Sequence, residues 1–163
     1  MICRGYLDIE TTGLSSAFSE LTVIGIGFEK GPNRKFIQLI GENISSSDLL
    51  KALKGVDVLY TYNGSRFDLP FIRNKLGTDL KVCVKHIDLM YDCWQQNLYG
   101  GLKKVEKALG ITRQIEGIDG KMAVWLWYDY INKGNKKSLE LLLGYNKEDV
   151  FNLSILRRKL KVG

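Results

Sequence analysis

The sequence predicts an α/β fold, a mixed five-stranded sheet flanked by helices, in which an antiparallel three-strand meander is followed by parallel strands. Short runs rich in Ile, Leu, Val, Phe and Tyr occupy the first third of the chain, and helical patterns fill its second half. The chain has 163 residues, of which 45% are hydrophobic and 26% are charged. This size and composition fit one domain, and we expect residues 1–163 to form it.

Each expected strand is bounded by turn residues. The strands are expected at residues 3–9, 22–28, 34–40, 57–62 and 81–87. Gly13 and the Gly31-Pro32-Asn33 turn separate the first three runs, which favours the meander. The fourth strand should lie beside the first and run parallel to it, because a helical crossover precedes it.

The expected helices begin at capping residues. The first follows Ser45–Asp48 and ends before Gly55. The others are expected at residues 68–76, 88–98, 101–109, 119–132 and 136–160. Asp68 is a candidate cap for the helix that it begins, and Asp88 is expected to be a cap or supporting residue rather than a metal ligand. The crowded aromatic residues of the 119–132 helix are expected to be mostly core: Trp125, Trp127, Tyr128 and Tyr130.

Composition narrows the class of protein. No stretch approaches the roughly 20 apolar residues that cross a bilayer, and charged residues interrupt the first ten positions, so we expect no membrane association and a cytoplasmic location. The 3 cysteines form no C-x-x-C pair and are expected to be buried free thiols. A net charge of +6 favours a polyanionic partner, although a solvated lysine-rich face would give the same value.

Asp8 and Glu10 form the first acidic motif, at the end of an apolar run. In a strand, residues two apart point to the same face, with Cα atoms roughly 6–7 Å apart. Two acids projecting together from a buried strand repel each other unless a cation lies between them. The alternative is a strand end whose acids lie in solvent.

Asp68 is the second candidate, in the loop that follows the fourth strand. If that strand is parallel to the first, the loop opens beside Asp8 and Glu10, where open α/β sheets place their ligands. A capping role for Asp68 and a metal-ligand role have similar support from the sequence.

Asp149 is the third candidate, because it lies on an apolar stripe of the last helix rather than on its polar face. The stripe consists of Leu139, Leu142, Asn146, Asp149, Leu153, Leu156 and Leu160. A buried, unpaired carboxylate is costly, so Asp149 needs a counter-charge, and a cation shared with Asp8 and Glu10 would supply it. Tyr145 lies one turn earlier on the same side of the helix, where a packed aromatic is the alternative to a functional hydroxyl.

Three segments, D-I-E-T-T-G at 8–13, Y-N-G-S-R-F-D at 62–68 and Y-N-K-E-D at 145–149, resemble the three motifs of the DEDD 3′–5′ exonucleases, a superfamily with the ribonuclease H-like fold. The tyrosine four residues before the last aspartate resembles the DEDDy branch, whereas position 144, where the DEDDh branch has histidine, is Gly. The segment G-G-L-K-K-V-E-K-A-L-G-I at 100–111 is similar to the YprB-like group of predicted exonucleases.

The resemblance implies a site with two divalent metal ions, Mg²⁺ or Mn²⁺. Asp8, Glu10 and Asp149 would hold one ion, and Asp8 and Asp68 the second, while Tyr145 would orient the attacking water. The implied reaction is hydrolysis from the 3′ end of nucleic acid, which releases 5′-mononucleotides. Single-stranded or 3′-overhanging DNA or RNA is the implied substrate.

Residues next to the motifs resemble substrate contacts of the superfamily. They are Thr11, Thr12, Gly13, Leu14, Asn63 and Phe67. For Leu14 and Phe67 a place in the core is at least as well supported as contact with the terminal base. Two alternatives to an independent exonuclease stay open: a nucleic-acid-binding or scaffold domain with weak or no turnover, and a proofreading-type subunit of a polymerase complex.

Overall fold

The computed structural model describes residues 1–163, and its strands form one mixed sheet. The strands β1 (Cys3–Thr11), β2 (Leu21–Lys30) and β3 (Asn33–Ile40) are antiparallel, and β4 (Val58–Thr61) and β5 (Lys85–Asp88) run parallel to β1. The strand order is β3-β2-β1-β4-β5, so β1 is the central strand. The predicted fold class, a meander followed by parallel strands, is confirmed.

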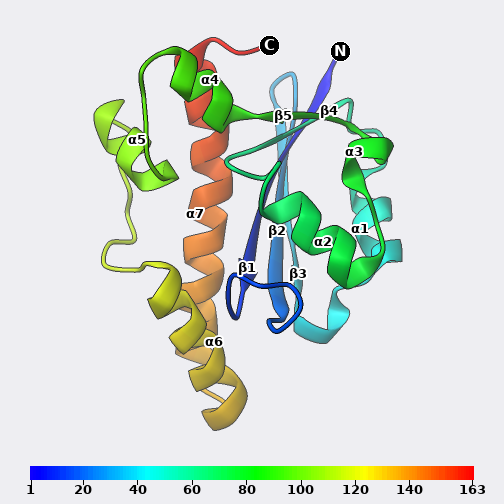
Figure 1. Ribbon diagram of the computed structural model, residues 1–163, viewed down its shortest axis with the longest axis vertical. Coiled ribbons are helices and arrows are strands. Elements are labelled where there is room, and N and C mark those ends of the chain that lie inside the picture. Colours follow the sequence, from blue (N-terminus) through cyan, green and yellow to red (C-terminus); the bar gives the residue numbers. More distant parts are fainter.

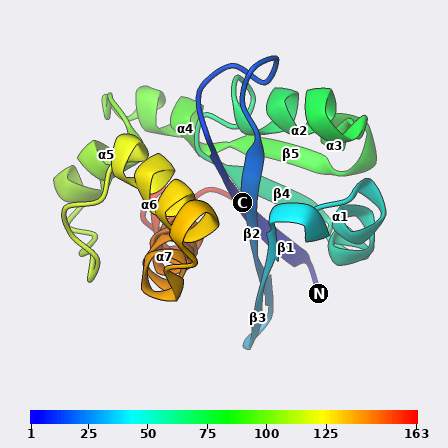
Figure 2. The same cartoon turned by 90° about the horizontal axis from the view of Figure 1, so that it is seen from below.

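Helices cover both faces of this sheet. They are α1 (Ser46–Leu53), α2 (Asp68–Leu76), α3 (Leu80–Cys83), α4 (Leu89–Gln95), α5 (Leu102–Ala108), α6 (Gly120–Lys133) and α7 (Lys136–Leu160), with a 3-10 turn at Gly41–Asn43. The long helix α7 crosses one face over β1 and β2, whereas α1, α2 and α3 lie on the other face (Figures 1 and 2). None of these helices combines the length and the apolar character of a membrane span.

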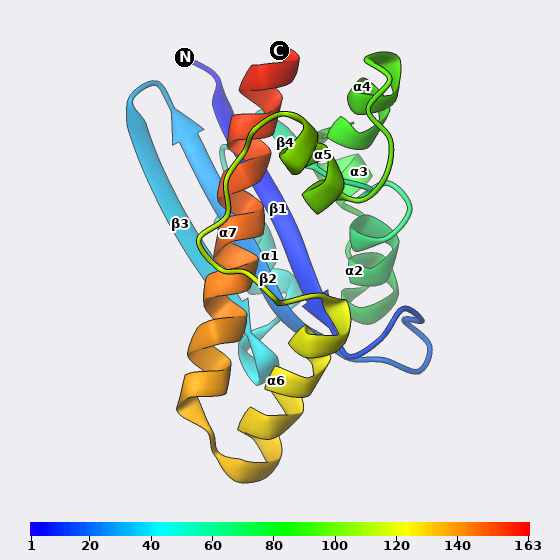
Figure 3. The same cartoon turned by 90° about the vertical axis from the view of Figure 1, so that its left-hand side faces the viewer.

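The side-chain alternation of β1 divides its residues between the two faces. Leu7 and Ile9 pack with the α1, α2 and α3 side chains in one core, and Tyr6 packs with α7 in the other. Asp8 and Glu10 have the same parity as Tyr6, so both carboxylates emerge on the face that Tyr6 shares with α7. Figure 3 shows α7 crossing this face of β1.

Two local predictions need correction. The expected fifth strand, 81–87, pairs with β4 only at Lys85–Asp88, because the Asp79 carboxylate accepts the Lys81 amide (3.0 Å) and begins the short helix α3. Asp68 does not cap its helix with its side chain, since Phe67 holds the N-cap position and makes no side-chain cap bond.

The burial of cysteines and aromatic residues also differs from prediction. Only Cys93 is buried, whereas Cys3 is half-buried and Cys83 is exposed. Trp125 and Tyr128 are exposed, and Trp127 and Tyr130 are half-buried. The physical reason is that α6 packs on α7 along one side, which small and aliphatic residues already fill, so the bulky rings remain outside.

Candidate metal-binding active site

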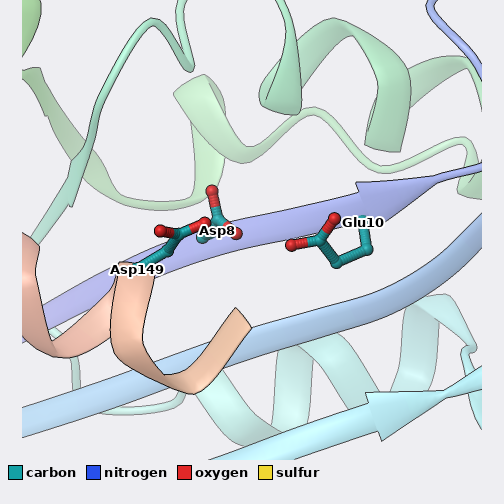
Figure 4. A group of neighbouring side chains, drawn as sticks. All are labelled: Asp8, Glu10 and Asp149. Carbon is teal, nitrogen blue, oxygen red and sulfur yellow. The ribbon is translucent and has the colours of Figure 1, made fainter. Parts of the chain in front are cut away.

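Three carboxylates converge where β1 meets α7. One oxygen each from Asp8, Glu10 and Asp149 lies within 4.8 Å of the other two. In Figure 4 the Glu10 carboxylate turns toward Asp8 and Asp149, although Asp149 comes from a helix near the other end of the chain. The structure therefore brings together the first and third sequence motifs.

An asparagine fixes α7 against β1 at this point. The Asn146 side-chain amide donates to both the main-chain oxygen (3.2 Å) and the carboxylate (3.0 Å) of Asp8, and Gln38 donates to Asn146 Oδ1 (2.9 Å). Gly25 pairs with Asp8 in the sheet, and a Cβ there would collide with the Asn146 side chain. The absence of a side chain at Gly25 thus lets α7 approach closely enough to place Asp149 beside Asp8.

Asp68 borders the cluster from the other side of β1. Its carboxylate accepts the main-chain amide of Ile9 (3.2 Å), the residue between the two acids of the first motif. Asp68 is outside the group of three whose oxygens lie within 4.8 Å of one another. Its charge nevertheless contributes to the raised pKa of both Asp8 and Glu10, so it belongs to the same electrostatic environment.

These acids lie where ionisation is costly. Burial, and then the negative charge of Asp149, raises the pKa of Asp8 and of Glu10 well above the usual range. Burial raises the pKa of Asp68 to about 7 and that of Asp149 to about 6. Glu10 is only 8% exposed and accepts no hydrogen bond from the protein. Groups that repel in this way favour a cation between them, and oxygen ligands suit Mg²⁺, Mn²⁺ or Ca²⁺.

Arg113 is a part of the site that the sequence analysis missed. It forms an ion pair with Asp149 and a two-pronged one with Glu106, at 2.5 Å from Nε and 2.8 Å from Nη2. Glu106 is 1% exposed and also accepts from the Asn152 side chain (3.2 Å). Asp149 therefore has a counter-charge from the protein itself, and its other oxygen is left for a shared cation.

The burial of Glu106 could have been predicted from its position in the sequence. It lies on the same helical face as Leu102 and Leu109, just as Asp149 lies on a leucine stripe. A second acid on an apolar stripe predicts a second buried charge that needs a partner. No local pattern identifies Arg113 as that partner, because it lies in the irregular segment between α5 and α6.

Tyr145 lies under two cations. The Lys103 ammonium is 4.7 Å and the Arg113 guanidinium 5.9 Å from the centre of its ring. Burial, and then the charges of Asp149, Glu10 and Asp8, raises its pKa. The phenol is therefore neutral and keeps its proton, and its hydroxyl accepts and donates no hydrogen bond within the protein.

Asp88 holds the loop after β4 in place. Its carboxylate accepts the main-chain amides of Asn63 (2.8 Å), Ser65 (2.9 Å) and Met90 (3.1 Å). The bond to Met90 caps α4, as the sequence led us to expect. Asn63 adopts a left-handed backbone conformation with φ of 58°, which positions the loop that leads to Asp68.

A cavity of about 680 Å³ opens beside Glu10. Its lining includes Ile9, the Thr11–Leu14 segment, Phe67 and the start of α6, from Asp119 to Lys121. Leu14 is 88% exposed, so a place in the core is wrong for this residue. Phe67 is half-buried against Phe71 and also lines the cavity, so its position is compatible with both of the roles that the sequence left open. Asn63 is not among the lining residues.

Solved structures of low sequence identity have this fold. The family B DNA polymerase of the hyperthermophilic archaeon Pyrobaculum calidifontis matches with a TM-score of 0.73 and 17% identity, over 99% of this chain and 25% of the polymerase. Brucella melitensis NrnC matches with a TM-score of 0.62 and 21% identity, over 99% of this chain and 73% of NrnC. Other structures of that NrnC hold pGG or Mg²⁺. The chain thus spans about a quarter of the polymerase and most of NrnC.

No curated protein matches the sequence. A family model, described as the RNase_H superfamily, matches residues 5–161, which include β2 to β5, most of β1 and every acid of the cluster. The chain therefore belongs to the RNase H superfamily.

Proposed function

We propose that this protein is a divalent-metal-dependent 3′–5′ exonuclease that releases 5′-mononucleotides from single-stranded or 3′-overhanging nucleic acid. The observation that carries the proposal is the group formed by Asp8, Glu10 and Asp149, with oxygens within 4.8 Å of one another at the edge of a cavity of about 680 Å³. The family membership and the folds of the polymerase and of NrnC support it.

The donor set fits hard divalent cations. Asp8, Glu10 and Asp149 would hold one ion and Asp8 and Asp68 a second, and burial is the largest cause of the raised pKa of each of the four carboxyls. When bound, such ions supply an activated water and neutralise charge on the phosphate. The protein's own contribution is the fixed geometry, which Asn146 and Arg113 maintain.

Tyr145 has a separate role in this proposal. Its neutral hydroxyl, free of protein partners and close to the three acids, would orient the attacking water. The Tyr145→Phe variant should lower kcat with little change in KM, since it removes only the hydroxyl. An unchanged kcat would leave Tyr145 with a packing role alone.

The Thr11–Leu14 segment and Phe67 would contact the terminal nucleotide. Thr11 Oγ1 donates to the Gly13 carbonyl (2.7 Å), and Thr12 Oγ1 accepts the Glu20 amide (2.8 Å), so both side chains shape the loop rather than reach freely into the cavity. The exposed Leu14 side chain and the Phe67 ring are the apolar surfaces that remain for a base.

A binding domain without turnover is the second candidate. The Arg113–Asp149 ion pair favours it, because a protein cation already neutralises one of the acids. The likeness to one quarter of a DNA polymerase leaves a proofreading-type subunit as a related possibility. A domain that only binds does not need the Glu10 carboxylate, which is 8% exposed and accepts no hydrogen bond from the protein, whereas a proofreading-type subunit would use this carboxylate as the proposed exonuclease does.

The deciding experiment is a gel time course with single-stranded DNA and RNA, labelled at either the 5′ or the 3′ end, in Mg²⁺, Mn²⁺ or EDTA. We expect a ladder that shortens from the 3′ end only when metal is present. Asp149→Asn should lower the rate by orders of magnitude, while Glu140→Gln, an exposed acid on the same helix, should not. Internal cuts would indicate an endonuclease, and binding without cleavage by the native protein would favour the binding domain.

A further inference from the structure

A row of large apolar side chains on α6 faces solvent. Met122, Trp125, Tyr128 and Ile131 are 41%, 55%, 47% and 54% exposed. The opposite side of α6 contributes Ala123 and Leu126 to the core that it shares with α7. An exposed apolar row of this size on a helix is typical of a binding surface.

Only the first half of this row adjoins the candidate active site. A second cavity, of about 400 Å³, is lined by Gly117, Asp119, Lys121, Met122 and Trp125. It shares Asp119 and Lys121 with the cavity of about 680 Å³ that contains Glu10. The two cavities therefore adjoin at Asp119 and Lys121, between Glu10 and the Trp125 ring, and Tyr128 and Ile131 line neither of them.

The chemistry of these two adjoining cavities suits a single nucleic-acid strand. An aromatic ring offers a stacking surface to any base, and a lysine beside it attracts the phosphates between bases. The Asp119 carboxylate caps α6 by accepting the Met122 amide (2.8 Å), so it is already engaged with the helix. Lys121 is exposed and forms no salt bridge, so its charge is free for a phosphate.

We propose that the second cavity binds the nucleotides that precede the 3′-terminal one, with the Trp125 ring stacked on a base and Lys121 beside a phosphate. This inference rests on the proposed function, because it takes the strand end to lie at the acidic cluster. It assigns to the protein a substrate longer than one nucleotide and makes Trp125 a determinant of affinity for it. A protein partner would instead use the whole row, Tyr128 and Ile131 included.

Equilibrium binding tests this assignment. A fluorescein-labelled single strand of about ten nucleotides, as DNA and as RNA, is titrated with the protein in Mg²⁺, in the Asp149→Asn background so that the strand is not consumed. Trp125→Ala should weaken binding by about 5-fold to 150-fold, the range found when a stacking aromatic is removed. Trp125→Phe should restore most of the affinity, and Ile131→Ala, an equally exposed change on the same helix, should leave it unchanged.

Three results would overturn the proposal. They are unchanged binding by Trp125→Ala, equal losses from Trp125→Ala and Ile131→Ala, and a failure of Trp125→Phe to restore affinity. Hydrolysis of the p-nitrophenyl ester of thymidine 5′-monophosphate, which spans one nucleotide, tests the proposed function separately. If the native protein does not hydrolyse this ester or the strand, the exonuclease proposal fails, whereas the binding difference between Trp125→Ala and Ile131→Ala still decides the role of Trp125.

Discussion

Acids lie at the carboxyl ends of two parallel strands, β1 and β5, which β4 separates, and the hydrogen bonding of these acids differs. Asp88, at the end of β5, is 5% exposed and accepts three main-chain amides. Asp8, near the end of β1, accepts only from the Asn146 side chain, and Glu10 accepts no hydrogen bond at all. One carboxylate is surrounded by donors, whereas the other two face further acids.

This difference in hydrogen bonding indicates a structural role for Asp88 and a cation-binding role for the acidic cluster. Backbone donors stabilise the charged form of a buried carboxylate, so Asp88 can hold the loop before α2 without any additional cation. Asp8, Glu10 and Asp149 instead repel one another at short range. Such a cluster lowers the stability of the metal-free fold, and we interpret it as a site that is completed by binding a cation.

The largest expected effect is that of pH on the stability of the metal-free protein. Burial raises the pKa of Asp68 from its usual 3.8 to about 7 and that of Asp149 from 3.8 to about 6. At pH values between the usual pKa of 3.8 and the raised pKa values, these carboxyls hold more protons in the folded chain than in the unfolded chain. The free energy of unfolding should therefore fall as the pH rises from about 4 to above 7. In EDTA the protein should therefore be more stable at pH 5 than at pH 8.

Urea or thermal unfolding at several pH values checks this prediction. Saturating Mg²⁺ should flatten the dependence, because a bound cation stabilises the ionised carboxylates. Asp8→Asn should also reduce it, since one repelling charge is then absent. Stability in EDTA that increases from pH 5 to pH 8 would mean that the cluster does not carry the repulsion described above.

The second prediction concerns a substitution that leaves paired acids without their partner. Arg113→Met removes the partner of both Glu106 and Asp149, whose carboxylates are nearly buried. Breaking a buried ion pair from one side costs about 3–5 kcal/mol, so the free energy of unfolding should fall by that amount. The double variant Glu106→Gln, Arg113→Met should recover part of the loss, because it leaves no unpaired charge at position 106. A double variant as unstable as the single one would assign Arg113 to packing alone.

Some features of the fold and of the site follow from the local sequence pattern, whereas others depend on tertiary contacts. The meander and the pairing of β4 with β1 follow from turn residues and the helical crossover, and the shared face of Asp8 and Glu10 and the burial of Asp149 follow from periodicity. The structure agrees with all four. The partner of Asp149 does not follow from periodicity, because Arg113 lies in an irregular segment whose path depends on tertiary contacts. Periodicity shows that a charge is buried, whereas the source of its compensation depends on three-dimensional packing.

The prediction that the aromatic residues of α6 are mostly core was wrong for a related reason. Aromatic residues are usually core, and the sequence does not reveal how much of a helix its neighbours cover. Since α6 packs on α7 along one side, Trp125 and Tyr128 remain at the surface. The start of α2 also depends on a distant contact. The Asp68 carboxylate accepts the amide of Ile9, a residue far away in the sequence, instead of capping its own helix, and Phe67 holds the N-cap position.

The third prediction compares the two acidic groups directly. Asp88→Asn replaces an acceptor of three amides by a side chain with a single oxygen, so it should lower the free energy of unfolding by about 1–3 kcal/mol. Asp8→Asn makes the same chemical change inside the repelling cluster, and it should raise the stability of the metal-free protein at pH 8 while it removes most of the stabilisation by Mg²⁺. Thermal melts of both variants in EDTA and in Mg²⁺ measure the two signs in one experiment. A loss of stability of equal size in both variants would make Asp8 a structural residue like Asp88, and the acidic cluster would then need no cation to explain it.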